Sequence, residues 1–361
     1  MDITAAVSHG PTSLFDLEDV TIAEPLPDEL RVRMVATGIC HTDLTLKSIS
    51  AENAPAVFGH EGAGIVDAVG SAVTDVKVGD HVVLGFSSCG ACGACSDGQK
   101  AYCHQFGALN VAGRRPDGSA VLSQDGSPVW SSFFGQSSFA THAVINRRSA
   151  VVVDSDVDLT ACAPMGCGFL TGAGAVVNVL RPNSDSTFAV FGTGGVGMAA
   201  IMAAAALEVR TIIAVDLSAE RREVALQVGA THAIDGASEA LRDEIRELTR
   251  GGVTHGLDTT AVPSVIRTAA LALGSRGQLA VVGVGLPDVA IDISDLISNG
   301  KSIRGSIEGD SDPAQLIPLL LRWQREGKFP VDKVITTYPF AQINEAVASA
   351  TGPVVKAVLK F

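Results

Sequence analysis

The sequence has few aromatic and few charged residues. Of its 361 residues, 5% are aromatic and 18% are charged, whereas 47% are hydrophobic. This composition excludes disordered and fibrous classes and indicates a globular chain. Cations are also scarce: 26 Lys and Arg stand against 39 Asp and Glu, a net charge of -13. Nucleic acid or an anionic membrane would require a basic face, so we expect neither as a partner.

We also expect no secretory signal. The chain starts Met1-Asp2-Ile3-Thr4, without a basic segment followed by an apolar one. We therefore expect a cytoplasmic protein. Residues 188–207 contain no charge and are long enough to span a bilayer. However, the stretch joins a short apolar strand to an Ala-rich helix through clustered glycines, which predicts a buried strand–helix unit instead.

The length favours two domains, since a domain usually has roughly 100 to 200 residues. Residues 30–39 and 62–69 are short, β-branched segments between turns, which predicts a β-rich first domain. After about residue 164, apolar strands alternate with helices, and this predicts an α/β fold with a doubly wound parallel sheet. The predicted strands are 187–191, 211–215 and 277–284, and the predicted helices are 198–207, 219–228 and 238–248.

The end of the chain returns to strand and turn. We expect a helix over residues 313–326 and a final strand over 354–361 that rejoins the first domain. Residues 110–128, rich in Gly, Ser and Asp, predict a surface loop.

Four of the seven cysteines lie within one short segment. They have the spacing C-x2-C-x2-C-x7-C, which can close around one ion: Cys89, Cys92, Cys95 and Cys103. Tetrahedral zinc suits an all-thiolate shell, and a site with four protein ligands is structural. An iron–sulfur cluster is the alternative. Cys162 is predicted to be a small buried hydrophobe.

A glycine-rich turn follows the predicted strand 187–191. The motif G-x-G-x-x-G uses Gly192, Gly194 and Gly197, with Gly195 and Val196 between them. Such a turn lets a dinucleotide pyrophosphate approach the start of a helix.

Two residues near the end of the next strand bear on the choice of dinucleotide. Asp216 would accept hydrogen bonds from the adenosine ribose and repel a 2′-phosphate, so NAD is favoured over NADP. Arg221 is predicted to cover the same ribose. The alternative, that Asp216 merely caps the helix beginning near residue 219, is compatible with the ribose role.

Three further residues have the chemistry of an open metal site. One imidazole and two thiolates leave zinc a fourth position for a substrate, and Cys40, His60 and Cys167 could supply them. Their spacing alone does not distinguish this from ordinary structural roles.

Several motifs occur in an order that resembles the zinc-containing medium-chain alcohol dehydrogenase family. They are ATGICHTDL, GHEGAGIVDAVG, VGDHVVL, the four-cysteine loop, MGCGFLTGAGAV and FGTGGVG, and together they cover nearly the whole chain. The stretch FFGQSSFATHA, residues 133–143, most resembles the bacterial aryl-alcohol (benzyl alcohol) dehydrogenase branch.

The resemblance implies an architecture and an activity. A GroES-like catalytic domain would comprise residues 1–168 and 309–361 and hold two zinc ions, and a Rossmann domain of residues 169–308 would bind NAD. The enzyme would oxidise a small-molecule primary aryl or allylic alcohol, such as benzyl alcohol, by hydride transfer to NAD. It would be a homo-oligomer, either a dimer or a tetramer, and the strand near residues 281–284 could pair across a dimer.

The resemblance also implies individual roles around the catalytic zinc. Cys40, His60 and Cys167 would bind the ion, Asp43 would orient the His60 imidazole, and Glu61 would lie behind the ion and bind it transiently. The nicotinamide ring would be held by Thr171, Val196, Val282 and Val284, and Phe139 would line the substrate pocket. Phe86 also suggests an apolar pocket, the alternative being that such apolar residues belong to the core.

The proton route departs from the family pattern. Thr42 would take the alcohol proton, but many relatives have a histidine three residues further on, where this chain has Thr45. We predict that water or the Thr45 hydroxyl replaces that histidine. His41 stands where many relatives place an arginine over the pyrophosphate. Our hypothesis is that NAD binding weakens as His41 deprotonates, the alternative being a neutral hydrogen-bond donor.

Two other functions are compatible with parts of this pattern. A thiol-adduct-dependent formaldehyde dehydrogenase would need cations for the adduct's carboxylate, which Arg114 and Arg115 could supply. A non-catalytic NAD-binding protein on the same scaffold would have no need of an open metal site, so the ligand set argues against it.

Overall fold

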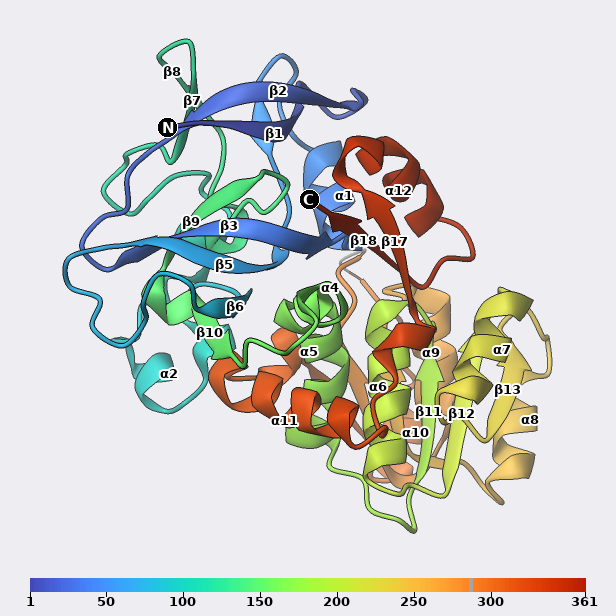
Figure 1. The fold of residues 1–361 in the computed structure, drawn as a ribbon. Helices are drawn as coiled ribbons and strands as arrows, with labels where there is room; N and C mark the ends of the chain where they lie inside the picture. Colours follow the sequence, from blue (N-terminus) through green and yellow to red (C-terminus); the bar gives the residue numbers. More distant parts are fainter. Residues whose placement is uncertain (286–287) are drawn as a thin grey trace. The chain divides into compact units, whose positions relative to one another are not determined.

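The computed structural model describes residues 1–285 and 288–361, which form two compact units (Figure 1). Unit 1 comprises Met1–Cys167, Asp312–Pro318 and Ile335–Phe361, and unit 2 comprises Gly168–Ser311 and Leu319–Val334. The division differs from the predicted one in residues 168, 309–311 and 319–334, which belong with unit 2. In that unit the ring of Phe329 packs 6.2 Å from that of Phe169.

Unit 1 contains two β-sheets. The order of the first sheet is β4 (Ala56–Val57), β1 (Asp2–Ser8), β2 (Phe15–Ile22), β7 (Leu122–Gln124) and β8 (Ser127–Val129). The order of the second is β10 (Ala150–Val153), β6 (His81–Leu84), β5 (Glu61–Val69), β3 (Glu29–Gly38), β18 (Lys356–Lys360) and β17 (Ile335–Pro339), with β9 (His142–Asn146) also pairing with β3. The C-terminal strand therefore rejoins the first part of the chain, as the sequence predicted.

The helices of unit 1 are short. They are α1 (His41–Ser48), α2 (Gly93–Ser96), α3 (Phe106–Asn110), α4 (Leu159–Cys162) and α12 (Ile343–Ala350). The helix α11 (Pro313–Arg325) contains residues of both units.

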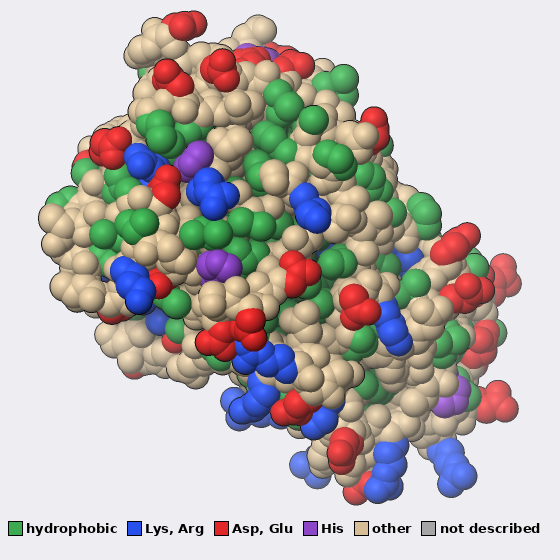
Figure 2. Space-filling view, in the orientation of Figure 1, with side chains coloured by type: hydrophobic (Ala, Val, Ile, Leu, Met, Phe, Trp, Pro, Cys, Tyr) green, Lys and Arg blue, Asp and Glu red, His purple; other side chains and the backbone are tan. Residues whose placement is uncertain are grey.

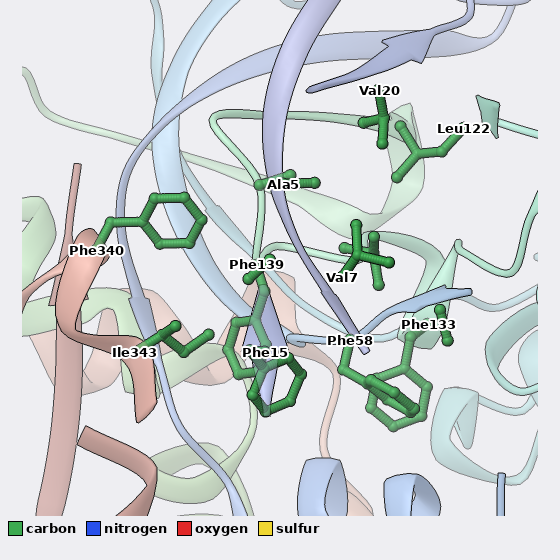
Figure 3. Close-up of a cluster of buried hydrophobic side chains, with 14 of the residues drawn as sticks. Ala5, Val7, Phe15, Val20, Phe58, Leu122, Phe133, Phe139, Phe340 and Ile343 are labelled. Carbon is green, nitrogen blue, oxygen red and sulfur yellow. The ribbon is translucent and has the colours of Figure 1, made fainter. Parts of the chain in front are cut away.

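Aromatic rings form much of the first core of unit 1. Phe15, Phe58, Phe133 and Phe139 are almost completely buried there and lie together in Figure 3. The ring of Phe139 meets that of Phe15 edge to face, with centroids 5.8 Å apart. This packing holds β1, β2 and the segment before β9 in one core, where burial of each ring stabilises the fold by roughly 1.5 to 3 kcal/mol.

Unit 2 contains one parallel sheet of six strands. Its order is β13 (His232–Asp235), β12 (Thr211–Asp216), β11 (Thr187–Phe191), β14 (Val253–Asp258), β15 (Leu273–Val281) and β16 (Ser302–Gly305). Its helices are α5 (Gly168–Gly174), continued by a π-helical turn Ala175–Leu180, then α6 (Gly195–Ala206), α7 (Ala219–Gln227), α8 (Leu241–Leu248), α9 (Pro263–Ala272) and α10 (Ile293–Ser298). The α/β prediction with a doubly wound parallel sheet is confirmed.

Three local predictions need correction. Residues 122–128 of the predicted loop, together with Val129, form the hairpin β7–β8. This hairpin pairs with β2 and so gains order from the sheet edge rather than from its own composition. Strand β15 ends at Val281, before the predicted end at residue 284. It is also not an edge strand, because β14 and β16 flank it, and β16 forms that end of the sheet.

The surface shown in Figure 2 carries scattered acidic and basic side chains with hydrophobic ones between them, and no continuous basic patch on that face. Within residues 1–285 and 288–361, no single helix is long and apolar enough to cross a membrane, although one bent pair, residues 159–166 with 168–180, meets the length and composition test together. The uncharged stretch 188–207 forms β11 and α6, as the sequence predicted.

Candidate active site

The structure brings together the three predicted ligands of an open metal site. Cys40 directly precedes α1, His60 directly precedes β5, and Cys167 follows a 3-10 turn, yet their ligand atoms lie within 4.8 Å of one another. All three belong to unit 1. Antiparallel pairing of β3 with β5 sets Gly38 opposite Glu61 and so places Cys40 near His60.

Among the described residues, only one ring nitrogen of His60 has a hydrogen-bond partner. Its Nδ1 lies 2.9 Å from Oδ1 of Asp43, and both side chains are buried. Its Nε2 is also buried and has no hydrogen-bond partner in the described residues. A ligand histidine donates its other ring N–H to a carboxylate, so this environment fits a metal ion bound at Nε2.

Asp43 is fixed by its own hydrogen bonds. Besides His60, Oδ1 accepts from the Gly59 amide at 2.9 Å, and Oδ2 accepts from the Cys40 amide at 2.9 Å. Asp43, the predicted orienting partner of His60, is therefore hydrogen-bonded to the backbone amide of one ligand, Cys40, and to the amide next to another, His60.

The electrostatics of the site favour a charged sulfur. A hydrogen bond from Cys167 and the charge of His60 hold the pKa of Cys40 well below its usual value, against the opposing effect of burial. Burial lowers the pKa of His60, but the charges of Asp43 and Cys40 raise it well above its usual value. Thiolate is the form in which cysteine binds a metal.

Glu61 is engaged by a lysine that the sequence analysis missed. Both carboxylate oxygens lie 2.9 Å from Nζ of Lys356, which also donates to the Ile39 carbonyl oxygen at 3.1 Å. Both side chains of the ion pair are buried. Lys356 lies 295 residues from Glu61 in the sequence, and only the pairing of β18 with β3 brings it here.

Aromatic rings surround His60. The ring of Phe134 stacks on the imidazole with centroids 4.5 Å apart, and Phe133 meets it edge to face at 5.1 Å. The ring of Phe106 packs on that of Phe134, and the ring of Phe86 packs on that of Phe106, with centroids 5.9 Å apart in each pair. Together these rings form an aromatic wall. Phe134 and Phe106 are half-buried, so this wall has an open side.

The predicted pocket residue Phe139 does not belong to this wall. Its side chain has no exposed surface and packs with Phe15 in the core. Because β1 and β2 cover it, Phe139 is a core residue in this structure, and Phe134 takes the position beside His60.

The second group of cysteines has the dimensions of a closed zinc site. The Sγ atoms of Cys89 and Cys95 lie 3.9 Å apart, and those of Cys92 and Cys103 lie 4.0 Å apart. A tetrahedron with zinc–sulfur bonds of about 2.3 Å requires about 3.8 Å between sulfurs. These distances are too long for a disulfide. All four ligand atoms lie within 4.8 Å of one another, so a single ion fits better than a cluster whose cysteines are spread over several irons.

Backbone amides support the thiolates of this loop. Cys92 amide nitrogen lies 3.3 Å from the sulfur of Cys89, and the His104 amide lies 3.4 Å from that of Cys92. Hydrogen bonds from the backbone amides of His104 and Cys95 lower the pKa of Cys92 to about 6.

The glycine-rich turn in unit 2 has the shape that a pyrophosphate requires. Gly192 has φ 88°, and a Cβ at Gly197 would lie 2.0 Å from the Gly192 carbonyl oxygen. At Gly194 a Cβ would meet nothing within 4 Å, which leaves open space at the start of α6. The residues present therefore fit a dinucleotide at the helix N-terminus.

Asp216 occupies the carboxyl end of β12, as predicted. Its Oδ2 accepts from the Thr193 amide at 2.7 Å and the Thr193 hydroxyl at 2.9 Å. The cap of α7 is Ser218, whose hydroxyl accepts from the Arg221 amide at 3.2 Å. The alternative in which Asp216 caps that helix is therefore wrong, and its carboxylate instead ties β12 to the glycine-rich turn.

Two of the predicted nicotinamide contacts lie side by side in unit 2. A Cβ at Gly172 would lie 1.9 Å from the Val196 carbonyl oxygen, so Thr171, next to Gly172, lies close to the start of α6. Val282 follows β15, with its amide 3.0 Å from the Asp258 carbonyl oxygen. Val284 is 76% exposed.

Comparison with known proteins decides the family. The family described as "Alcohol dehydrogenase GroES-like domain" matches residues 26–155, and that described as "Zinc-binding dehydrogenase" matches residues 195–322. Geraniol dehydrogenase of Castellaniella defragrans is 44% identical over 362 residues, which cover 99% of this chain and 97% of that protein. The chain belongs to the zinc-dependent medium-chain alcohol dehydrogenase family.

Solved structures support the same membership. A zinc-binding-domain alcohol dehydrogenase from Burkholderia ambifaria has a TM-score of 0.97 and 43% identity, covering 100% of this chain and 99% of that one. Benzyl alcohol dehydrogenase from Acinetobacter calcoaceticus has a TM-score of 0.95 and 40% identity, with the same coverage. The predicted resemblance, the GroES-like domain and the alcohol dehydrogenase activity are confirmed.

Beside the candidate metal ligands of this alcohol dehydrogenase lies the predicted proton acceptor. The Thr42 hydroxyl is 3.7 Å from the Cys40 sulfur, and Thr42 is half-buried. The Thr45 hydroxyl donates to the His41 carbonyl oxygen at 3.1 Å. His41 is exposed at the first turn of α1.

The arginines of the 110–128 segment do not form a pair of free cations. Arg115 is buried and makes two hydrogen bonds to the Glu29 carboxylate, at 2.9 and 2.8 Å, and a third to the Glu24 carbonyl oxygen at 3.1 Å. Arg114 is exposed. The Arg115 charge is thus neutralised within unit 1, which leaves Arg114 as the exposed cation of the two.

Proposed function

We propose that this alcohol dehydrogenase oxidises primary aryl or allylic alcohols, such as benzyl alcohol, to aldehydes, with NAD as the hydride acceptor. The observation that carries the proposal is the pair of half-buried rings, Phe134 and Phe106, beside His60, whose Nε2 has no hydrogen-bond partner in the described residues. Flat, unsaturated alcohols offer surfaces that stack on such rings. Relatives named geraniol dehydrogenase and benzyl alcohol dehydrogenase act on alcohols of these two kinds.

In this proposal Cys40, His60 and Cys167 hold a catalytic zinc, and Cys89, Cys92, Cys95 and Cys103 hold a structural one. Bound zinc supplies Lewis acidity toward the alcohol hydroxyl. Asp43 keeps the His60 ring oriented, and the Glu61–Lys356 pair holds the strand behind it.

The proton and cofactor roles are carried by other residues. Thr42, beside Cys40, accepts the hydroxyl proton of the alcohol and passes it to solvent, either through water or by way of Thr45. NAD supplies the hydride acceptor and is bound by the glycine-rich turn. The Asp216 carboxylate receives the ribose hydroxyls, with Arg221 nearby, and the nicotinamide lies against Thr171, Val196, Val282 and Val284.

The test is a substrate panel with metal counting. Benzyl, cinnamyl and geraniol-type alcohols, ethanol, and formaldehyde with glutathione are each assayed with NAD and with NADP. We expect kcat/KM to be at least tenfold higher for the aryl and allylic alcohols with NAD, and two zinc ions per chain. Higher activity with the formaldehyde–glutathione mixture would favour the thiol-adduct alternative, and a preference for ethanol would contradict the role of the aromatic wall.

A further inference from the structure

The segment that carries the aromatic wall has an unusual backbone. Ser132, Phe134 and Ser137 have φ values of 60°, 49° and 52°. Left-handed conformations are costly for residues other than glycine and persist where surrounding contacts hold them. The contacts that hold this segment therefore matter for the position of Phe134 and of its neighbour His60.

Gln136 makes the central contacts of the segment. Its side chain is 2% exposed, and its Nε2 donates to the His60 carbonyl oxygen at 2.8 Å and the Gly85 carbonyl oxygen at 3.4 Å. Its Oε1 accepts from the Gly62 amide at 3.1 Å. Both N–H groups and the oxygen of the amide are thus used.

These bonds grip the backbone on both sides of Glu61. His60 and Gly62 flank that residue at the start of β5, so one side chain fixes the place where the strand leaves the metal site. Asp43 holds the imidazole ring, whereas Gln136 holds the backbone that carries it.

The third hydrogen bond of Gln136, to the Gly85 carbonyl oxygen, lies near a second predicted ligand, Cys167. A Cβ at Gly166 would lie 2.0 Å from the Leu84 carbonyl oxygen, so the residue before Cys167 packs directly on the backbone beside Gly85. Gln136 is therefore tied to the chain beside two of the three ligands, although it contacts no ligand atom.

We infer that Gln136 is a positioning residue that sets the geometry of the catalytic metal site. The inference rests on the proposed binding of zinc by Cys40, His60 and Cys167. It predicts that loss of the amide alters the ligand field and the retention of the metal, beyond any effect on stability.

Asn110 offers a matched control. Its side chain is fully buried in the same unit, donates to the carbonyl oxygens of Ser87 and Phe106 at 2.9 Å, and accepts from the Ser87 amide at 2.8 Å. It thus makes the same three kinds of backbone hydrogen bond as Gln136, but none of them to the start of β5.

The experiment compares Gln136→Leu, Gln136→Glu and Asn110→Leu in full-length, cobalt-substituted enzyme. Visible spectra report each cobalt site, chelator-induced release reports metal retention, and thermal unfolding reports stability. Cobalt bound by Cys40, His60 and Cys167, called the Cys2His site, should give absorption bands distinct from those of cobalt in the four-cysteine site. Gln136→Glu keeps the side-chain length but places an oxygen against the His60 carbonyl, so it perturbs the site without a cavity.

We expect both Gln136 variants to shift the Cys2His bands and to release that ion about 10- to 100-fold faster, as for other partners around metal ligands. Asn110→Leu should lower the unfolding temperature and leave those bands and that release rate unchanged. If Gln136→Leu does not fold, the bands and the release rate of Gln136→Glu test the inference.

The inference is overturned if the Gln136 variants and Asn110→Leu lose stability alike while the Cys2His bands and release rate stay unchanged. It is also overturned if Asn110→Leu shifts those bands as much as the Gln136 variants do. Absence of a Cys2His cobalt band in the wild-type enzyme would instead contradict the proposed zinc assignment, so the two failures are distinguishable.

Discussion

Replacing Lys356 with methionine should strongly destabilise unit 1. The side chain of Glu61 is completely buried, Lys356 is 5% exposed, and Nζ lies 2.9 Å from each carboxylate oxygen. The variant removes the cation while the carboxylate stays inside the protein. Removing one partner of a buried ion pair costs about 3 to 5 kcal/mol. For a domain of this size that corresponds to a fall of roughly 6 to 20 °C in the melting temperature of the unit.

The assay is chemical and thermal unfolding at equal zinc loading, extended to a double mutant. Glu61→Gln combined with Lys356→Met should recover most of the loss, because a neutral amide replaces the unpaired charge. The surface pair Arg147–Asp75, at 2.7 Å and with side chains 26% and 64% exposed, gives the control: Arg147→Met should cost less than about 1 kcal/mol. A Lys356→Met protein within about 1 kcal/mol of wild type, or a double mutant no more stable than the single one, would refute the reasoning.

Four further outcomes are expected. Asp43→Asn should lower zinc affinity by about 10- to 100-fold in chelator competition, because an amide cannot accept from the imidazole and both backbone amides at once. Asp216→Ser should reduce the NAD/NADP ratio of kcat/KM by about tenfold or more, and an unchanged ratio would count against its ribose role. Burial lowers the pKa of His255, so its contribution to stability is complete above the unfolded pKa of about 6.5 and is lost as the pH falls. The urea midpoint of the wild-type protein should therefore fall between about pH 7.5 and 5.5, and His255→Gln should make this fall smaller. Thr45→His should raise turnover if proton release limits the rate, and unchanged turnover with an unchanged pH profile would contradict this.

Features that depend on neighbouring residues could be predicted well from the sequence. The strand Thr187–Phe191, the glycine turn and α6 follow one another along the chain, and a Cβ at Gly197 would strike the Gly192 carbonyl oxygen. The sequence also predicted the segment 110–128 as a loop, but part of it forms a hairpin. Its own Gly, Ser and Asp content could not reveal that β2 offers it an edge to pair with.

The aromatic wall beside His60 illustrates a different kind of error. Phe139 and Phe134 are both aromatic residues of one short segment, and Phe139 was the one predicted to line the substrate pocket. The left-handed backbone at Phe134 turns its ring onto His60, whereas Phe139 enters the core with Phe15. Which ring faces the site depends on backbone geometry that residue type does not encode.

The sequence by itself determined the four-cysteine loop and the dinucleotide turn, because their functional groups lie a few residues apart and short-range geometry suffices to bring them together. It also supplied the three ligands of the open site, but only through family resemblance. Tertiary structure alone decided that Lys356 holds Glu61 and that Gln136 holds the backbone of His60. Such contacts join strands distant in the chain, and the register of those strands is set by burial of the whole core rather than by any local pattern.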